Sequence, residues 1–559
     1  MAYFLKKNIK KGRTYLSIVN SFYSADTKDT AHKTYKSLGS VETLKKKGIS
    51  DPIDYYQKEV DKLNEENENK EAIKVGEKSP YKYGGHFIIK AIIEKLNVKP
   101  YIDILNKTTN FHFNLYDLLC SLIFSRILNP CSKIKTFEEV IPYLDTEYIF
   151  SYNQLLDGLG FLGDNYKKIV ELFTKMTKEK YEIDTRITYF DCTNFYFEID
   201  LQDEIRRKGP SKENRSDPII GMGLLLDANQ LPIGMKLYPG NESEKPVIRN
   251  VISELKSSND ITGKVIQIAD KGLNCARNIY EALKNKDGYL FSQSCLQLSS
   301  VEKTWVLLDN DYVEVVGKDG KVKYKIKECV DDFSYSFKDD DGKEIKFTVK
   351  EKRVVTYNAA LASKKKTEIQ KLVNKAKGLC VSCAKKDEYG ESSKYVDFVD
   401  EDGNKAKAKI NEKKIEEDLK IAGYNLLVTS EIKADKVAIY NSYHNLWRIE
   451  ESFRMMKSEI EARPVYLKKQ STIFGHFLIC YLCVLLIRIL QIKILNDEDS
   501  YQDIFKFIRE LIFTIYDSKY INMIGASDMV NKMTKLTKLP VDNYILSDSQ
   551  YKKLMNYKL

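Results

Sequence analysis

Residues 187–191 read ITYFD, a run of β-branched and aromatic residues followed by a carboxylate. This content is typical of a buried strand. A second stretch, residues 265–270 (VIQIAD), has the same pattern and ends at Asp270. A carboxylate inside a buried strand would lose its solvation, so we expect Asp191 and Asp270 at the exposed ends of two strands. Ligands of open α/β sheets gather beyond the carboxyl ends of the strands, which places both aspartates beside a cleft.

A third carboxylate, Glu450, lies in residues 443–457, whose sequence favours a helix. Hard divalent ions such as Mg²⁺ take oxygen ligands and bind through a few carboxylates together with substrate phosphates. Two such ions about 3.5–4 Å apart stabilise the attacking and the leaving oxygen of a phosphoryl displacement. A single aspartate at a strand end more often caps the following turn, so the prediction of a metal site rests on Asp191, Asp270 and Glu450 together.

Residues 443–457, YHNLWRIEESFRMMK, resemble the Tyr-x2-Arg-x3-Glu-x6-Lys signature of the DDE transposases of bacterial insertion sequences, in the IS-four family. Tyr443, Glu450 and Lys457 match three of the four signature positions, and Leu446 stands where the signature has arginine. Positions seven residues apart in a helix lie within a narrow stripe, so the three matching side chains are expected on one face. The resemblance implies that this face binds transposon-end DNA beside the catalytic metal.

An arginine elsewhere on this helix is expected to replace the missing signature residue. Arg454, four residues after Glu450, returns to the same stripe. Arg448 is closer to position 446 but lies about 140° from Tyr443 around the helix. The alternative interpretation is an ordinary surface helix that carries a Glu–Arg pair four residues apart.

The segments around the aspartates are also similar to this family. Residues 189–198 (YFDCTNFYFE) resemble its first-aspartate block, and residues 268–274 (IADKGLN) resemble the second. The predicted order of strand, loop, hairpin, helix from about 245 to 255 and strand is that of a ribonuclease-H-like core, so we expect an α/β fold. The resemblance implies a transposase that cleaves DNA ends and transfers them to target DNA. Its two ions, Mg²⁺ or Mn²⁺, would both be bound by Asp191, with Asp270 completing one site and Glu450 the other.

The remaining regions are assigned around this core. Residues 86–186 have helical periodicity, and the resemblance implies that such a region recognises the terminal inverted repeats of the element. Alternating residues with Asp-Gly turns predict a mainly β insertion before the glutamate helix. The expected regions are 1–85 (strands, a helix and a linker), 86–186 (helical, binding DNA ends), 187–293 (first part of the core), 294–421 (β-rich insertion), 422–498 (second part of the core) and 499–559 (C-terminal helices).

The charge balance is consistent with a nucleic-acid partner. The formal net charge is +10 and the isoelectric point is about 8.7, a mild basic bias. Lysine runs on the surface are more often simply solvated, but the loop at 206–215 lies between catalytic strands, so Lys212 and Arg215 are predicted DNA contacts. The expected partner is double-stranded DNA, both terminal repeats and target. A homodimer is expected on DNA because the two cut ends must be held together.

The cysteines and the apolar runs bear on location. The ten cysteines show no disulfide framework, and no secretory signal is apparent, so we expect a reducing cytosol. The resemblance implies that this is a prokaryotic cytosol, with the protein at the nucleoid. Two Cys-x-x-Cys pairs lie a hundred residues apart, which is not the spacing of a zinc ribbon. The apolar run at 477–487 is shorter than the ~20 residues of a membrane span, so no membrane association is expected.

Two other functions remain open at this stage. The first is a domesticated or inactive relative that acts only as a DNA-binding regulator. The second is a structure-specific nuclease of the same fold, which would cut DNA without joining it. Terminal inverted repeats around the coding region would favour the mobile element over both.

Overall fold

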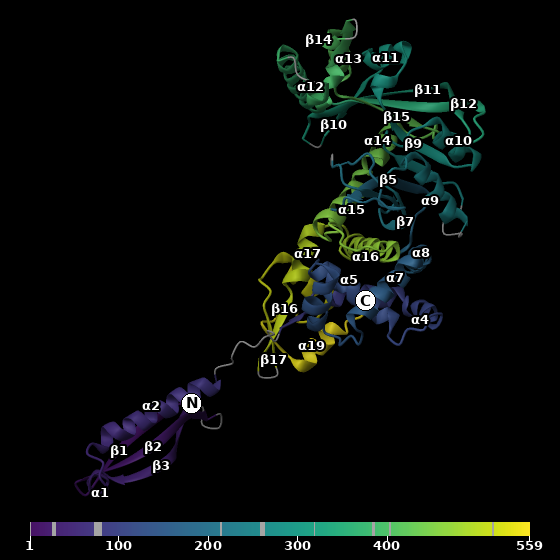
Figure 1. Ribbon diagram of the computed structural model, residues 1–559. Helices are drawn as coiled ribbons and strands as arrows, with labels where there is room; N and C mark the ends of the chain where they lie inside the picture. The colour runs from purple at the N-terminus through teal and green to yellow at the C-terminus, as the bar shows by residue number, and fades with distance from the viewer. Residues whose placement is uncertain are drawn as a thin grey trace. The chain divides into compact units, whose positions relative to one another are not determined.

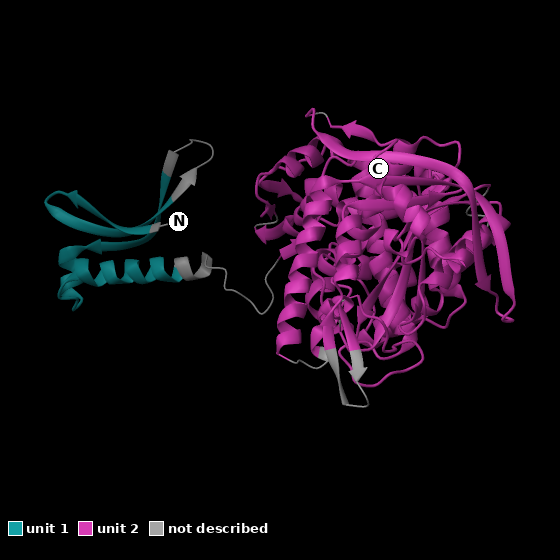
Figure 2. Ribbon diagram, turned by 90° about the horizontal axis from the view of Figure 1, so that it is seen from above, with its two compact units in different colours: residues 1–80 teal, residues 81–559 magenta. Residues whose placement is uncertain are grey.

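The computed structural model describes residues 2–24, 29–71, 81–212, 215–257, 263–317, 319–382, 386–401, 404–516 and 519–559. The chain divides into two compact units, Met1–Pro80 and Tyr81–Leu559 (Figure 2). The larger unit contains every residue that the sequence assigns to the candidate site.

The N-terminal unit is a three-stranded antiparallel sheet with two helices. Its middle strand agrees with the strands expected in this region and buries Leu16 and Ile18. The polar sequence of residues 65–83 favours the linker expected in this region, and this interpretation is wrong as far as Glu71, because the Glu- and Lys-rich residues continue a helix, and again at 81–83, which form a short strand. Residues 72–80 of that predicted linker lie outside the described residues. The elements are β1 Ala2–Lys10, β2 Arg13–Ser24, β3 Asp29–Ser40, α1 Val41–Lys46 and α2 Pro52–Glu71.

The larger unit contains a mixed sheet, whose strands lie above the helices α5, α7 and α16 in Figure 1. Among the described residues its strand order is β10-β11-β12-β15-β9-β8-β5-β6-β7. The pairs β5–β8 and β8–β9 are parallel, and the other neighbours are antiparallel. The strands are β5 Ile187–Tyr196, β6 Ile219–Leu226, β7 Pro232–Pro239, β8 Ile266–Ala269, β9 Gly288–Gln293, β10 Val313–Val316, β11 Val322–Lys338, β12 Glu344–Tyr357 and β15 Tyr424–Thr429.

Helices cover both faces of this sheet. Neighbouring residues of a strand point to opposite faces, and along β5 Tyr189 and Phe190 belong to two separate hydrophobic clusters. On the Phe190 face lie α9 Lys245–Ser257, close to the predicted 245–255, and α10 Ala276–Lys284. On the Tyr189 face lie α8 Tyr166–Tyr181, α14 Lys436–His444, α15 Trp447–Ser458 and α16 Gln470–Arg488.

Helix α16 is the centre of the helical layer, and it continues into the π-helical turn η5 Ile489–Ile494. It packs closely on α7 Tyr152–Asp164 and on α5 Leu115–Leu128. Together, residues Gln470–Ile494 are long and apolar enough to cross a membrane, longer than the run considered from sequence, but 94% of the most apolar window is buried inside the protein. One such helix is weak evidence for a membrane span, because the core helix of a soluble protein has the same composition.

The helical region and the C-terminal segment pack into one body. A short strand at the start of the larger unit, β4 Tyr81–Tyr83, pairs with β16 Ile512–Tyr516, giving a small sheet of order β18-β17-β16-β4. The C-terminal segment was predicted as helices alone, and it also holds three strands. The other elements are α3 Phe87–Leu96, α4 Lys99–Lys107, α6 Lys133–Lys135, η1 Thr136–Val140, η2 Ile141–Tyr143, α17 Tyr501–Glu510, β17 Lys519–Asn522, α18 Asp528–Thr537, β18 Ile545–Ser547 and α19 Asp548–Met555.

The insertion at 294–421 is only partly as predicted. The expected hairpins with Gly320 and Gly342 at positive φ are present, and β12 pairs with β15, so the hairpin extends the central sheet. The description as mainly β is incomplete because α12, rich in Ala and Lys, is a 23-residue helix. The remaining elements are η3 Cys295–Gln297, α11 Ser300–Leu307, α12 Ala359–Val381, η4 Lys386–Tyr395, β13 Val396–Glu401, β14 Asn404–Ile410 and α13 Glu412–Ile421.

Candidate active site

Asp191 and Asp270 lie side by side on adjacent parallel strands. The last residue pair between β5 and β8 is Phe190 with Ala269, and each aspartate is the next residue of its chain. Neighbouring strands are about 4.8 Å apart, so the two carboxylates begin from neighbouring backbone positions. The electrostatic influence of Asp270 on Asp191 reflects this proximity.

The prediction that Asp191 ends its strand is wrong. Strand β5 continues to Tyr196, and Asp191 pairs with Leu224 of β6 in its middle. The reason is that β6 continues the antiparallel pairing after β8 has ended at Ala269. Asp191 therefore lies in the middle of the β5–β6 pair and directly after the last residue pair between β5 and β8. Asp270 follows the end of β8, as predicted.

Glu450 lies on α15, the helix that covers the Asp191 face of the sheet. Asp191 follows Phe190, so its side chain lies on the opposite face, which α15 covers through contacts with β5 and β6. Glu450 is in the first turn of α15 and is exposed, whereas its neighbour Ile449 is buried against the sheet. One face of α15, which includes Ile449, therefore packs on the sheet, and the adjacent face, which carries Glu450, is open to solvent.

The predicted helix at 443–457 is broken in two. Helix α14 ends at His444 and α15 begins at Trp447, with i to i+3 backbone hydrogen bonds at Leu446 and Arg448. Tyr443 is therefore not on a continuous stripe with Glu450 and Lys457, and the prediction of one helical face for all three is wrong. Leu446, which stands at the signature's arginine position, is 6% exposed and packs into the core.

Tyr443 reaches the site by a different route. Its hydroxyl donates a hydrogen bond of 3.1 Å to Oδ1 of Asp270. Burial and the charge of Asp270 raise the pKa of Tyr443 well above its usual value, so the phenol keeps its proton and stays a donor. The bond orients the Asp270 carboxylate.

An open cleft of about 460 Å³ joins the strand and helix residues. Glu450, Arg454 and Lys457 line it from one face of α15, so their predicted common face is confirmed. Glu450 and Arg454 are both exposed, and among the described residues no ion pair joins them. The cleft is lined by Asp191, Cys192, Thr193, Lys212, Glu450, Phe453, Arg454, Lys457, Ser458 and Arg463, and Asp270 is not among these.

Lys212 lines the cleft and lies close to two carboxylates. Its ammonium lies 3.9 Å from Oδ1 of Asp191 and 3.3 Å from Oε1 of Glu244, and it donates a hydrogen bond to the carbonyl of Cys192. Burial raises the pKa of Asp191 to about 6, and the nearby Lys212 opposes this shift. Burial, together with the charge of Lys212, lowers the pKa of Lys457 to about 8. The cleft thus combines a partly desolvated carboxylate, that of Asp191, with several cations.

Arg215 lies next to the cleft and not in it. Its guanidinium is 3.8 Å from the ring centroid of Tyr196 and pairs with Asp217 at 3.5 Å. Arg463, which does line the cleft, lies over the same tyrosine ring at 5.1 Å. Of the two predicted loop contacts, the structure therefore brings only Lys212 into the cleft.

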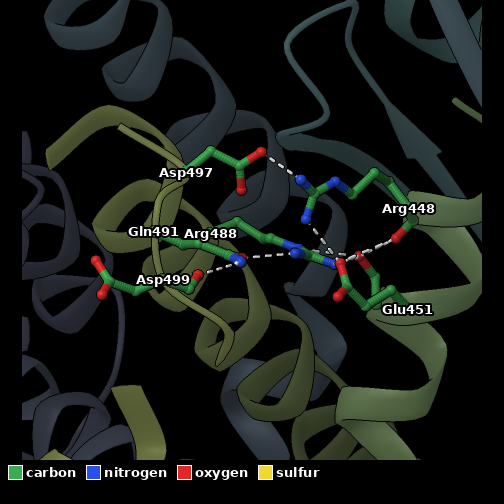
Figure 3. A network of polar contacts seen from close by, with 7 residues as sticks. Arg448, Glu451, Arg488, Gln491, Asp497 and Asp499 are labelled. Carbon is green, nitrogen blue, oxygen red and sulfur yellow. Dashed lines mark hydrogen bonds and ion pairs between the residues drawn. The ribbon is translucent and has the colours of Figure 1, made fainter. Parts of the chain in front are cut away.

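A buried charge network fixes α15 on α16 (Figure 3). Arg448 donates to Glu451 at 2.9 Å and also pairs with Asp497. The fully buried Arg488 of α16 pairs with the same Glu451 at 2.8 Å and donates to Gln491 at 2.6 Å. The prediction that Arg448 points away from the signature face is confirmed, and its role is to anchor the helix that carries Glu450.

Sequence reasoning missed two residues of the cleft region. Arg463 follows α15 in an irregular segment, so no periodicity marks it. Glu244 precedes α9, and the sequence gives no sign that its carboxylate pairs with Lys212. Both residues are brought in by chain segments whose course no local pattern predicts.

The donor groups of the site are of the kind that Mg²⁺ prefers, since all three candidates are carboxylates. Among the described residues, however, no three His, Cys, Asp or Glu side chains lie close enough together to hold an ion as they stand. The carboxylates around Asp191 share their surroundings with Lys212, whose ammonium lies between Asp191 and Glu244. The three carboxylates are therefore chemically suited to a divalent ion, but among the described residues they are too far apart to form a closed coordination shell.

A scan against models of known protein families finds no match for this chain, and a search of curated proteins finds none.

Proposed function

We propose that this protein is a DDE-type DNA transposase, which cleaves the ends of its insertion sequence and transfers them to target DNA by phosphoryl transfer with two divalent metal ions. The observation that carries the proposal is the register of β5 and β8. It places Asp191 and Asp270 at matching positions of adjacent parallel strands, on the face that the helix of Glu450 covers.

The order of elements in residues 187–293 supports a ribonuclease-H-like core. The chain forms a strand, a two-stranded hairpin, a helix, a strand, a helix and a further strand. The pairs β5–β6 and β6–β7 are antiparallel, whereas β8 pairs parallel with both β5 and β9. This is the order that the sequence predicts for such a core.

Asp191, Asp270 and Glu450 would hold the ions. When bound, two divalent ions stabilise the charge on the attacking and leaving oxygens of a phosphoryl transfer. The protein's own groups prepare the site for this chemistry. Tyr443 orients the Asp270 carboxylate through a hydrogen bond, and Lys212 balances the partly buried charge of Asp191.

The cations of the cleft would bind the DNA backbone. Arg454, Lys457 and Arg463 line the same cleft as Glu450. A guanidinium makes bidentate contacts with phosphate, and an ammonium acts as a compact positive charge. Phosphate contacts fix the position of a strand without reading its sequence, which is what is required beside a catalytic site that cuts at a defined end.

Carboxylate variants test the proposal. Asp191→Asn, Asp270→Asn and Glu450→Gln should each lower Mg²⁺-dependent cleavage of a terminal-repeat duplex by at least about 10³-fold, because metal catalysis supplies several kcal/mol of transition-state stabilisation. Binding of the same duplex in gel shifts should change little, since no DNA-reading group is lost. Glu179→Gln, at an exposed position of α8, is the matched control. Near-wild-type cleavage by any of the three variants would remove that residue from the site.

The same assay separates the proposal from its two alternatives. A DNA-binding regulator would bind the duplex but not cut it, with or without Mg²⁺. A structure-specific nuclease would cut branched or flapped DNA and would not join a 3′-hydroxyl end to a second duplex. Strand-transfer products that depend on Asp191 would favour the transposase over both.

A further inference from the structure

A second pocket lies beside the candidate active site. It has a volume of about 370 Å³ and is enclosed by the end of α5, residues 131–134, residues 461–467 and α16. Arg463 lines both this pocket and the catalytic cleft, so the two are neighbours. The pocket uses none of the carboxylates assigned to catalysis.

Two buried cations face this pocket. Arg126 is 6% exposed and Lys133 is 7% exposed, and both line the pocket. Arg126 has five N–H donors. Its Nη2 donates a hydrogen bond of 3.0 Å to the carbonyl of Cys131. Lys133 contacts Nδ1 of His476 at 3.4 Å. Among the described residues, neither cation forms an ion pair with a carboxylate.

His476 does not balance these charges. Its Nε2 lies 3.0 Å from the carbonyl of Ala462, which only accepts hydrogen bonds, so Nε2 carries the hydrogen and Nδ1 accepts from Lys133. Burial and the neighbouring Lys133 lower the pKa of His476 well below its usual value. The imidazole is therefore a neutral acceptor that holds the Lys133 ammonium in place.

Uncompensated burial of this kind is costly. A buried cation without a partner loses its hydration, and proteins rarely retain one without a use. Burial, with a smaller contribution from Arg126, lowers the pKa of Lys133 to about 7, which reflects the same cost. Among the residues that line the pocket, the single carboxylate is Glu461, which is exposed. A small anion with several acceptor oxygens would satisfy both cations at once.

We propose that this pocket binds a phosphate group between the Arg126 guanidinium and the Lys133 ammonium. A guanidinium fork matches two phosphate oxygens, and an ammonium matches a third. The proximity of the pocket to the catalytic cleft favours a phosphate of the bound DNA strand, an assignment that rests on the proposed function. Free inorganic phosphate has the same chemistry, and the experiment separates the two sources.

The first arm of the test uses inorganic phosphate and does not depend on DNA. Isothermal titration of the full-length protein in a phosphate-free buffer should detect binding, and Lys133→Met should weaken it at least tenfold. Without phosphate, Lys133→Met should melt at the same or a higher temperature than wild type, because it removes an unpaired buried charge. The matched control is Lys352→Met, since Lys352 is equally buried but pairs with Glu328 at 2.9 Å and should lose stability when replaced.

A second variant guards against misfolding. Arg126→Met should produce the same loss of phosphate binding, so that failure of one variant to fold leaves the other. Phosphate also raises the stability of proteins in general because it is excluded from their surface, and this effect would persist in both variants. Binding of phosphate in the pocket would be lost in both. Absence of phosphate binding to wild type, or equal binding by wild type and both folded variants, would overturn the proposal.

The second arm uses a DNA duplex at several salt concentrations. If a DNA phosphate occupies the pocket, Lys133→Met should weaken duplex binding and reduce the slope of log affinity against log salt by about 1. An unchanged slope together with lost phosphate binding supports the pocket and assigns it to a free anion. Phosphate binding by a wild-type protein that binds no DNA would support the pocket while contradicting the proposed function.

Discussion

Arg454 and Arg448 lie on the same helix but have different surroundings. Arg454 is exposed and lines the cleft, whereas Arg448 pairs with Glu451 and Asp497. We expect Arg454→Ala to weaken binding of a terminal-repeat duplex about tenfold, because a hydrogen bond to a charged group contributes ~1.5–3 kcal/mol. Its melting temperature should stay unchanged. Gel shifts at fixed salt measure the first effect and thermal denaturation the second.

Two further variants, Lys457→Ala and Arg448→Ala, serve as comparisons for Arg454→Ala. Lys457→Ala removes another cation of the cleft and should have a comparable effect on binding. Arg448→Ala should lower the melting temperature, since it takes a partner from the partly buried Glu451 and breaks the anchor of α15. If Arg448→Ala weakens DNA binding without a loss of stability, the assignment of the two arginines is wrong.

Asp145 provides a prediction on acid stability. Burial alone would raise the pKa of this carboxyl, but His86 at 2.6 Å and Lys90 at 3.1 Å outweigh burial and hold the pKa below its usual value. The folded state then binds fewer protons than the unfolded state, so the stabilisation is full above the unfolded pKa of about 3.9 and declines as pH falls below it. Asp145→Asn should therefore be less stable than wild type at pH 6.

The pH dependence distinguishes this from a general loss of packing. The difference in free energy of unfolding between wild type and Asp145→Asn should shrink as pH is lowered from 5 toward 2, and denaturant unfolding across that range measures it. Asp164→Asn, an exposed carboxylate, serves as the control. A difference that stays constant over this range would contradict the ion-pair explanation.

At the scale of elements, helices α7 and α16 approach closely through glycines. A Cβ built on Gly475 would lie 2.1 Å from the carbonyl oxygen of Leu159, and one on Gly163 would lie 1.8 Å from that of Ser471. These contacts involve backbone atoms that cannot rotate away. We expect Gly475→Ala to destabilise the larger unit by ~3 kcal/mol, because overpacking forces the two helices apart.

Gly378 is the matched control for this prediction. It lies inside α12, and a Cβ there would meet nothing within 4 Å. Gly378→Ala should stabilise the protein by ~0.4–1 kcal/mol, since alanine reduces the entropy of the unfolded chain and favours the helix. Chemical denaturation of both variants compares the two effects. Equal stability changes of the same sign would mean that helix propensity, and not close packing, governs position 475.

The elements also show which local patterns were informative. The apolar run that ends before Asp270 placed β8 correctly, and the helix expected from about 245 to 255 corresponds to α9, because both segments are strongly patterned. The break between α14 and α15 was not predicted, since residues 443–457 contain no Gly or Pro. Leu446 is buried at this break, and burial depends on residues distant in the sequence.

At the scale of the whole molecule, the proposed reaction requires two protomers. A transposase must hold both cut ends for joining, so light scattering on the DNA-bound protein should give the mass of two chains and two duplexes. Non-cleavable ends with Asp191→Asn protein allow the same measurement before chemistry. A monomeric complex that still joins both ends would contradict the prediction.

The sequence by itself determined which residues are candidates for the proposed site, but not how they are arranged in space. Carboxylates after apolar strands, and the spacing of Glu450, Arg454 and Lys457, are local features that alternation and helical periodicity reveal. Only the tertiary structure decided the rest. The extension of β5 beyond Asp191 depends on β6, and the bond from Tyr443 to Asp270 joins the end of α14 to the residue after β8. The physical reason is that pairing, burial and ion pairs such as Lys212–Glu244 join segments that are far apart along the chain, and no local pattern encodes their meeting.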